Sequence, residues 1–348
     1  MRYLDFERPI EDLDRMINEQ EDYTKKTGVE MGNEIETLKR KRHQLIRDTF
    51  YHLTPYQRIQ LARHPDRPYC LDYIRLLTSD FVELHGDRKF GEDPAIVGGF
   101  ANFDGTSVMV IGHQKGRDTE ENIVRNFGMP NPEGFRKALR LMETAERFKK
   151  PIISFIDSAG AYPGIGGEER GQAEAIAFNL MRMSRLRVPI LVVVTGEGGS
   201  GGALAIGVGD RVLLMQNAYY AVCTPEACAA ILFKDRAKAA SAVSSMKITG
   251  EDLLRLGIID EVIPEPVGGA HMNWQETADN LRESLLRNLH ELQNQTGDEL
   301  IENRYRRFRS IGEFEEIKER PLQFKTREFS EIENQEQKAK NPFSAVSA

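Results

Sequence analysis

The chain has 348 residues, and 47 lysines and arginines against 54 aspartates and glutamates give it a net charge of −7. Hydrophobic residues make up 40% of the sequence, yet no apolar stretch approaches the roughly 20 residues of a membrane span. The first 25 residues mix charges throughout and lack the apolar region of a secretory signal, so we expect a cytoplasmic protein with no membrane contact. The acidic balance also argues against a specific nucleic-acid partner.

Three cysteines are too few for a disulfide framework, and none of them form the C-x-x-C spacing typical of a structural zinc site: Cys70, Cys223 and Cys228. We therefore predict no metal site in this chain.

Residues 1–66 are rich in charge and in helix-forming residues, with apolar positions at mixed steps of three and four. This pattern predicts a pair of helices that is interrupted near Gly28 and Gly32. Thr54 and Pro55 are typical of the cap and first position of another short helix. We interpret the region as an N-terminal helical extension that covers the main domain or forms a subunit interface.

Residues 67–270 contain most of the glycines and all of the strand-like apolar runs. Strand and helix patterns alternate there, which predicts an α/β domain. The expected strands are 95–103, 107–112, 152–157, 190–195, 212–215, 219–223 and 258–263, and the expected helices are 131–148, 168–185, 200–207, 225–232, 236–246 and 249–256.

A C-terminal helical segment is expected at residues 271–323, with a helix at 274–295. Residues 324–348 offer almost nothing to bury, so we expect a disordered tail.

The most informative stretch is residues 190–210, ILVVVTGEGGSGGALAIGVGD, where a β-branched run enters a glycine loop and leaves as a helix. A junction of this kind presents unpaired backbone N–H groups, which bind an anion or a developing oxyanion. Three different functional motifs match this one stretch of sequence. The first is the dinucleotide motif Gly196-x-Gly198-x-x-Gly201, but no acidic residue follows at the expected distance of about 20 positions.

The second signature is the nucleophile elbow of a serine hydrolase, centred on Ser200 in G-x-S-x-G. Asp260 with His271 or His290 follows in the chain order of such enzymes. Against this alternative, extra small residues separate the expected strand end at Thr195 from the motif, whereas an elbow turns sharply off its strand. Both histidines also lie where the chain leaves the domain.

The third interpretation is an oxyanion hole made by backbone N–H groups around Gly201, Gly202 and Ala203, without covalent chemistry at Ser200.

A second glycine-rich junction follows the expected strand at 152–157. Asp157 is the only charge of that apolar run, and it acts either as a base or, as is more common, as a residue that ties a loop. Tyr162-Pro163-Gly164 would shape the wall of this loop.

Residues 112–142 contain a dense group of cations, which indicates an anionic partner: Lys115, Arg117, Arg125, Arg136, Lys137 and Arg140. The last three also fit a solvated helix face. Lys115 and Arg117 differ because they directly follow a strand, where a phosphate or a ureido carbonyl would fit.

Five segments in order, 83–99, 112–142, 157–180, 196–210 and 258–271, resemble the alpha-subunit family of the bacterial acetyl-CoA carboxylase carboxyltransferase. The resemblance extends over about residues 1–320 and implies a crotonase-like fold, a spiral of ββα units. It also implies a complex of two alpha and two beta subunits that moves a carboxyl group from carboxybiotin, on the biotin carboxyl carrier protein, to acetyl-CoA. A biotin carboxylase belongs to the larger complex, and the family's zinc site lies in the beta subunit.

The resemblance further implies that this subunit stabilises the ureido oxygen of biotin through backbone amides, which we place at Gly201, Gly202 and Ala203. The released ureido anion then serves as base for the acetyl proton, so neither a Ser–His–Asp set nor a metal is required. No cofactor is expected to be bound covalently in this chain. The substrate-binding residues expected from the matching segments are Lys115, Gly116, Arg117, Gly160, Ala161, Tyr162 and Gly164.

Overall fold

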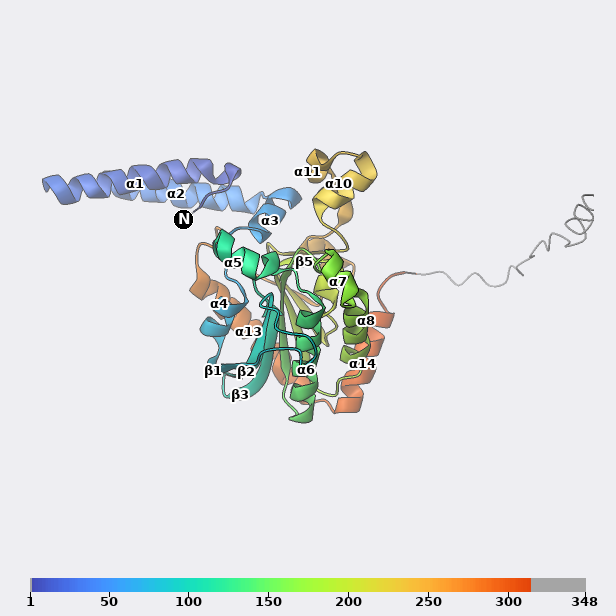
Figure 1. Ribbon diagram of the computed structural model, residues 1–348. Coiled ribbons are helices and arrows are strands. Elements are labelled where there is room, and N and C mark those ends of the chain that lie inside the picture. Colours follow the sequence, from blue (N-terminus) through green and yellow to red (C-terminus); the bar gives the residue numbers. More distant parts are fainter. Residues whose placement is uncertain (1, 314–348) are drawn as a thin grey trace, which may run out of the picture. The chain divides into compact units, whose positions relative to one another are not determined.

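Two long antiparallel helices open the chain in the computed structural model, which describes residues 2–313. Helices α1 (Arg8–Thr27) and α2 (Gly32–Tyr51) lie side by side (Figure 1), as the apolar spacing predicted. Gly28 ends α1 with a φ of +72°, a conformation that glycine adopts readily. Helix α3 (Pro55–Ala62) follows, and the Thr54 hydroxyl accepts the N–H of Gln57 as the predicted cap.

One mixed eight-stranded sheet forms the centre of the described residues, in the order β1-β2-β3-β4-β5-β6-β8, and β7 pairs with the end of β5. Strands β1, β2 and β3 pair in antiparallel fashion, and the pairs from β3 onwards are parallel. The strands are β1 Ser79–Glu83, β2 Ile96–Phe103, β3 Thr106–His113, β4 Ile152–Ser158, β5 Ile190–Gly199, β6 Arg211–Met215, β7 Tyr219–Ala221 and β8 Glu261–Ile263.

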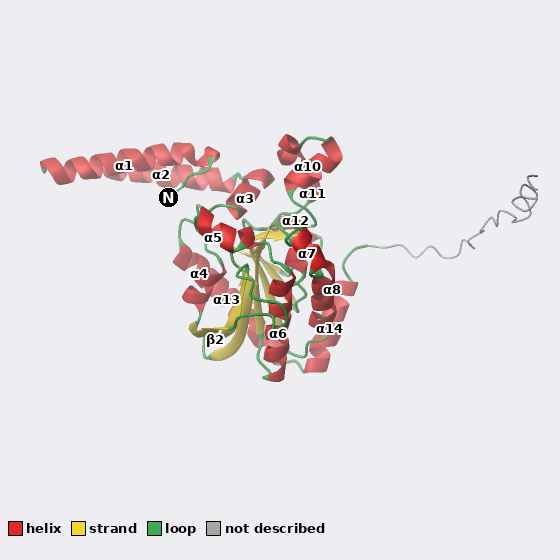
Figure 2. Ribbon diagram, in the orientation of Figure 1, coloured by secondary structure: helices red, strands yellow, loops and turns green. Residues whose placement is uncertain are grey.

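Helices cover both faces of the sheet (Figure 2). Helices α6 and α8 pack together on one face, and α4 and α13 pack together on the other. Strands β4 and β5 lie between these layers and are buried along their whole length, which explains their unbroken apolar sequences. The remaining helices are α4 Cys70–Leu77, α5 Thr119–Val124, α6 Pro132–Arg147, α7 Ile165–Glu169, α8 Gln172–Met183, α9 Ser200–Leu204, α10 Pro225–Phe233, α11 Ala239–Met246, α12 Gly250–Arg255, α13 Trp274–Gln293 and α14 Gly297–Arg309.

The α/β class and most of the elements are confirmed, but β5 is longer than predicted. It continues through Thr195 to Gly199, because residues 197–199 pair with β7 after residues 191–194 have paired with β6. The predicted helix 168–185 is also wrong as one element. Gly171, with a φ of +83°, separates α7 from α8.

Among the α-helices and strands of the described residues, four were not predicted from the sequence. Strand β1 is a short and mostly exposed edge strand without an apolar run, and α4 and α5 span only eight and six residues. Helix α14 falls inside the predicted helical segment, although no separate helix was expected there.

The described residues up to Gly312 form one compact unit. Boundaries at residues 66 and 270 within that unit stay a prediction. The expected tail 324–348 and the end of segment 271–323 lie outside the described residues. No helix in the described range has the length and apolar character to cross a membrane.

Candidate active site

The two glycine loops of the sequence meet at one edge of the sheet. Parallel strands β4 and β5 end side by side, and Ser158 pairs with Gly198. After these ends the chain continues into residues 159–164 and into α9, respectively. The carboxyl edge of a parallel sheet is where α/β proteins commonly bind their ligands.

Glycine allows the loops to touch. A Cβ atom on Gly199 would lie 2.1 Å from the carbonyl oxygen of Ala159, and a Cβ atom on Gly202 would lie 2.4 Å from the carbonyl carbon of Gly160. Gly160 has a φ of +156° and faces open space, with no atom within 4 Å of the position of a Cβ. The two loops therefore touch through backbone atoms, and a side chain at Gly199 or Gly202 would collide with the opposite loop.

The predicted oxyanion residues lie in the first turn of α9. The first four N–H groups of a helix have no partner within the helix, and in α9, whose N-cap is Gly199, these include the N–H groups of Gly201 and Gly202. That the N–H of Ala203 also serves as a donor stays a prediction. Ser200 and Gly201 also line a largely apolar pocket of about 430 Å³, together with Leu204, Tyr220, Val222, Phe308 and others.

Ser200 has the backbone but not the partners of a hydrolase nucleophile. Strand β5 runs directly into it and its φ is +50°, so the expectation that extra residues separate strand and motif was wrong. However, the residues that line the adjacent pocket include neither a histidine nor a carboxylate.

The proposed triad partners are engaged elsewhere. Asp260 accepts the N–H of Val212 and pairs with Arg307, and the buried His271 stacks on His64. The geometry therefore gives no support to a serine hydrolase.

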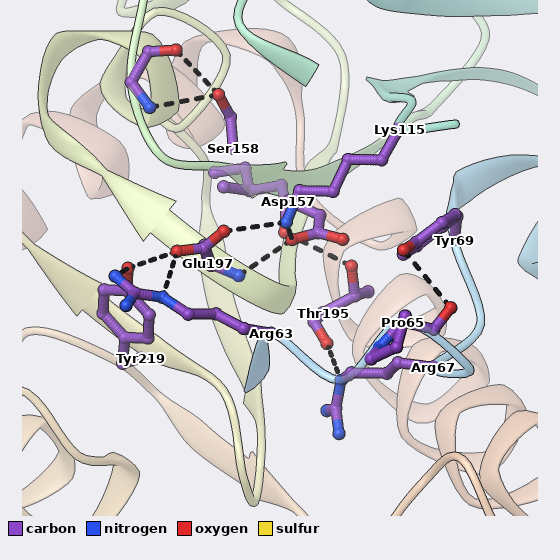
Figure 3. Close-up of polar contacts among 12 residues, drawn as sticks. Arg63, Pro65, Arg67, Tyr69, Lys115, Asp157, Ser158, Thr195, Glu197 and Tyr219 are labelled. Atoms are coloured by element: carbon purple, nitrogen blue, oxygen red, sulfur yellow. Dashed lines mark hydrogen bonds and ion pairs between the residues drawn. The ribbon is translucent and has the colours of Figure 1, made fainter. Parts of the chain in front are cut away.

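A buried network of charges lies beneath the loops (Figure 3). The Lys115 ammonium donates to Asp157 over 2.6 Å and to Glu197 over 2.9 Å. Glu197 in turn pairs with Arg63 over 2.7 Å and accepts the Tyr219 hydroxyl over 2.7 Å. Asp157 ties loops and strands, which is the more common of the two roles expected for it.

These contacts keep Glu197 and Lys115 in their charged forms. Burial would raise the pKa of Glu197, but Lys115 and Arg63 outweigh burial and lower it to about 2. Burial would lower the pKa of Lys115, but Asp157 and Glu197 outweigh it and raise that pKa. Neither group changes its protonation near neutral pH, so neither is suited to proton transfer.

The Arg117 guanidinium also has protein partners. It donates to the carbonyls of Pro65 and Arg67, pairs with Asp72, and lies 3.9 Å from the ring centroid of Tyr69. Gly116 contacts α5 so closely that a Cβ would lie 2.2 Å from the backbone nitrogen of Asn122. Direct contact of Lys115 and Arg117 with an anionic substrate stays a prediction.

The other predicted binding residues belong to the second glycine loop. Tyr162 donates its N–H to the Pro130 carbonyl, and its ring lies against Gly164, where a Cβ would approach the ring to 2.3 Å. Ala161 packs against the buried cluster of Phe135, Ala175 and Ala205. The structure thus brings Gly160 and Ala161 against Gly202 of α9.

Helix α6 does not present the solvated cationic face that the sequence suggested. Lys137 is fully buried against Glu92 and the Asp93 carbonyl. Arg136 pairs with Asp87, and Arg140 donates to the Gly86 carbonyl. These cations hold the segment 85–93 on the helix.

His113 ends β3 and lies beside the backbone of Gly202 in α9. Its ring is buried, and burial together with Lys115 lowers its pKa to about 3, while contacts with the backbone of Gly202 and Phe155 act in the opposite direction. The imidazole beside the turn that carries the candidate oxyanion donors is therefore neutral near neutral pH.

Glu7, His64 and His271 form a buried cluster whose ligand-type atoms lie within 4.8 Å of one another. The two imidazole rings are stacked, with centroids 3.9 Å apart and planes at 21°. A ring nitrogen binds a metal in the plane of its ring, so nearly parallel rings do not converge on one ion. The cluster does not fit a metal, and the expectation of no metal site stays a prediction.

Sequence reasoning missed Glu197 and Arg63 as members of the buried network, and Glu226 as the more exposed partner of Arg63. A signal existed for Glu197, which is a lone charge among glycines, as Asp157 is among apolar residues. It went unused because the strand was expected to end at Thr195. Arg63 carries no local signal, since it follows α3, more than 130 positions before Glu197.

The sequence and the fold are similar to those of known proteins. The family model described as acetyl co-enzyme A carboxylase carboxyltransferase-like matches residues 3–312. The chain belongs to this family. The acetyl-coenzyme A carboxylase carboxyl transferase subunit alpha of Geobacter metallireducens is 56% identical over 313 residues, which are 90% of this chain and 98% of the relative. The subunit of the same name from Thermus thermophilus is 53% identical over 313 residues, or 90% and 99% of the two chains.

Solved structures agree with the crotonase-like carboxyltransferase fold. Transcarboxylase 12S with methylmalonyl-coenzyme A bound has a TM-score of 0.54 at 21% identity, covering 67% of this chain and 43% of that chain. A Pseudomonas malonate decarboxylase hetero-tetramer in complex with coenzyme A has a TM-score of 0.54 at 16% identity, covering 78% and 98%. The predicted fold and the predicted carboxyltransferase family are both confirmed.

Proposed function

We propose that this chain is the alpha subunit of an acetyl-CoA carboxylase carboxyltransferase, which moves the carboxyl group of carboxybiotin to acetyl-CoA and forms malonyl-CoA. The observation that carries the proposal is the pair of glycine loops in backbone contact at the ends of β4 and β5, with neither a histidine nor a carboxylate lining the pocket beside Ser200. This arrangement suits a reaction in which the protein stabilises developing charge and forms no covalent intermediate.

The reaction needs a stabilised oxygen on biotin. The N–CO₂ bond of carboxybiotin breaks to give carbon dioxide and the ureido anion, whose charge rests on the ureido oxygen. That anion takes a proton from the methyl group of acetyl-CoA, and the resulting enolate attacks carbon dioxide. Biotin and malonyl-CoA are the products, and every proton and electron pair is accounted for.

The N–H groups of Gly201, Gly202 and Ala203 are the donors that we assign to the ureido oxygen. Gly160, Ala161, Tyr162 and Gly164 form the opposite wall of the substrate space. Lys115, Gly116 and Arg117 act from behind that wall, through their contacts with Asp157, α5 and Tyr69.

The proposal needs partners. One enolate-stabilising site and the acetyl-CoA pocket belong to a beta subunit in an alpha₂beta₂ complex, which also carries the zinc. Carboxybiotin arrives on the biotin carboxyl carrier protein after a biotin carboxylase has loaded it. The assembly works in the cytoplasm, and this chain holds no covalent cofactor.

The test is co-expression of the full chain with a beta subunit, followed by an assay of malonyl-CoA decarboxylation that depends on added biotin. We expect the purified complex to be active and each subunit alone to be inactive. Activity of this chain alone at a comparable rate would contradict the division of the site between two subunits. A stable complex without biotin-dependent activity would overturn the proposed reaction.

A further inference from the structure

Five charged side chains of alternating sign form a continuous row behind the glycine loops: Asp157, Lys115, Glu197, Arg63 and Glu226. The successive N···O distances are 2.6, 2.9, 2.7 and 2.6 Å. Figure 3 shows the inner four members, which come from β4, the turn after β3, β5 and the turn after α3. The row therefore joins segments that are distant in the sequence.

The inner part of the row is closed to solvent. The side chains of Asp157, Lys115 and Glu197 are only 4%, 13% and 10% exposed. Asp157 also accepts the backbone N–H of Glu197 over 2.9 Å, which joins the ends of β4 and β5 directly. Ion pairs in such a position are hard to replace by water, so they resist movement of the two strands.

Neighbouring glycines leave room for these side chains. A Cβ atom on Gly196 would lie 2.5 Å from a carboxylate oxygen of Asp157, and one on Gly128 would lie 2.8 Å from Cγ of Lys115. The backbone is thus shaped around the row.

The row lies immediately before both loops. Asp157 precedes Ser158, which pairs with Gly198, and Glu197 lies three positions before Ser200, where α9 begins. A change in the separation of these two carboxylates would move the Gly160 loop relative to the first turn of α9.

We propose that Lys115 and Glu197 are positioning residues, whose ion pair fixes the spacing between the Gly160 loop and the N–H donors of α9. Arg63 extends this fixation to α10, because it pairs with Glu226 in the first turn of that helix. The expected effect of these residues on the transfer rate rests on the proposed function. Their expected effect on the spacing of the two loops does not.

The test compares Lys115→Met with a matched control, Arg304→Met. Arg304 forms a similarly buried ion pair with Asp210, which accepts the N–H of Ile190 at the opposite end of β5. Both variants lose a buried cation, so we expect both to lower the melting temperature. Only Lys115→Met is expected to accelerate amide hydrogen exchange at residues 196–206.

In the complex with the beta subunit, we expect Lys115→Met to lower kcat by about 10²-fold, while KM for biotin changes by less than about threefold. Arg304→Met should retain kcat. Equal exchange at residues 196–206 in both variants, or an equal loss of kcat, would overturn the positioning role and leave general stability as the only effect.

Glu226→Gln tests the row if Lys115→Met does not fold. Glu226 is 36% exposed and lies at the outer end, so the variant is expected to fold and to show a smaller acceleration of exchange at residues 196–206. Unchanged exchange in that variant would contradict the extension of the row to α10. If the wild-type complex lacks transferase activity, the proposed function fails, whereas the exchange comparison still decides the positioning role.

Discussion

Gly202 and Gly160 touch through their backbones, because a Cβ atom on Gly202 would lie 2.4 Å from the Gly160 carbonyl carbon and 2.5 Å from the Ala161 nitrogen. We predict that Gly202→Ala separates the two loops. Both the melting temperature and the transferase rate should fall, the rate by about 10²-fold, since the amide donors move with the turn. The measurements are a thermal melt and the biotin-dependent rate of the assembled complex.

Gly201→Ala is the matched control. A Cβ atom there would meet only the side chain of Ile176, at 3.5 Å, which is an ordinary contact. We expect a melting temperature close to that of the wild type and at least about a tenth of its rate, because the backbone N–H is kept. Equal losses in the two variants would mean that the loop contact is not what makes Gly202 necessary.

Ser200 is held in a left-handed conformation with a φ of +50°, which is unfavourable for a residue with a Cβ atom. Ser200→Gly should therefore raise the free energy of unfolding by about 1 kcal/mol. Ser200→Ala should retain at least about a tenth of the transferase rate, because the assigned donors are backbone amides. Denaturant titration and the transferase assay measure the two effects.

The same variants distinguish the hydrolase alternative. A serine nucleophile would react with a fluorophosphonate probe, and Ser200→Ala would abolish all activity. Labelling of Ser200 in the wild-type chain would contradict the backbone mechanism.

Most of the sheet was predictable because buried parallel strands have unbroken apolar sequences, such as residues 152–157 and 190–194. The end of β5 was not predictable, since its last residues are Gly-Glu-Gly-Gly and owe their extended form to β7 and to the contact with Ala159. The local sequence favours a loop there, but pairing with β7 makes these residues part of the strand.

The site was predictable in part, for a similar reason. The glycine pattern at residues 199–202 indicates close backbone approach, and the structure brings Gly160 to that position. The roles of Lys115 and Arg117 depend on carboxylates and carbonyls contributed by other segments, including Asp72 and Glu197. Sequence alone shows a cation but not whether the fold already neutralises it.

Arg117 offers a test of that distinction. Its guanidinium bonds the carbonyls of Pro65 and Arg67 and stacks on Tyr69, which a lysine cannot reproduce. Arg117→Lys should lower the free energy of unfolding by about 2 kcal/mol and leave KM for both substrates within about threefold. A large rise in KM with normal stability would instead indicate direct contact with an anionic substrate group.

His113 gives the chain a pH dependence of stability. Burial lowers its pKa from 6.5 to about 3 in the folded protein, and burial also lowers the pKa of His64 to about 4. Below pH 6.5 the unfolded chain binds protons at these positions that the folded chain does not bind. The free energy of unfolding should therefore fall as the pH decreases from about 6.5 towards 4, with a slope approaching 1.4 kcal/mol per pH unit for each histidine.

Replacement of His113 by glutamine removes one of the protons that the unfolded chain binds and the folded chain does not. We expect His113→Gln to reduce the slope of the unfolding free energy between pH 6 and 4 by about 1 kcal/mol per pH unit, whatever its effect at pH 7.5. Urea titrations of the wild type and the variant at several pH values measure both slopes, and a wild-type slope in His113→Gln would show that the buried imidazole is already protonated in the folded protein.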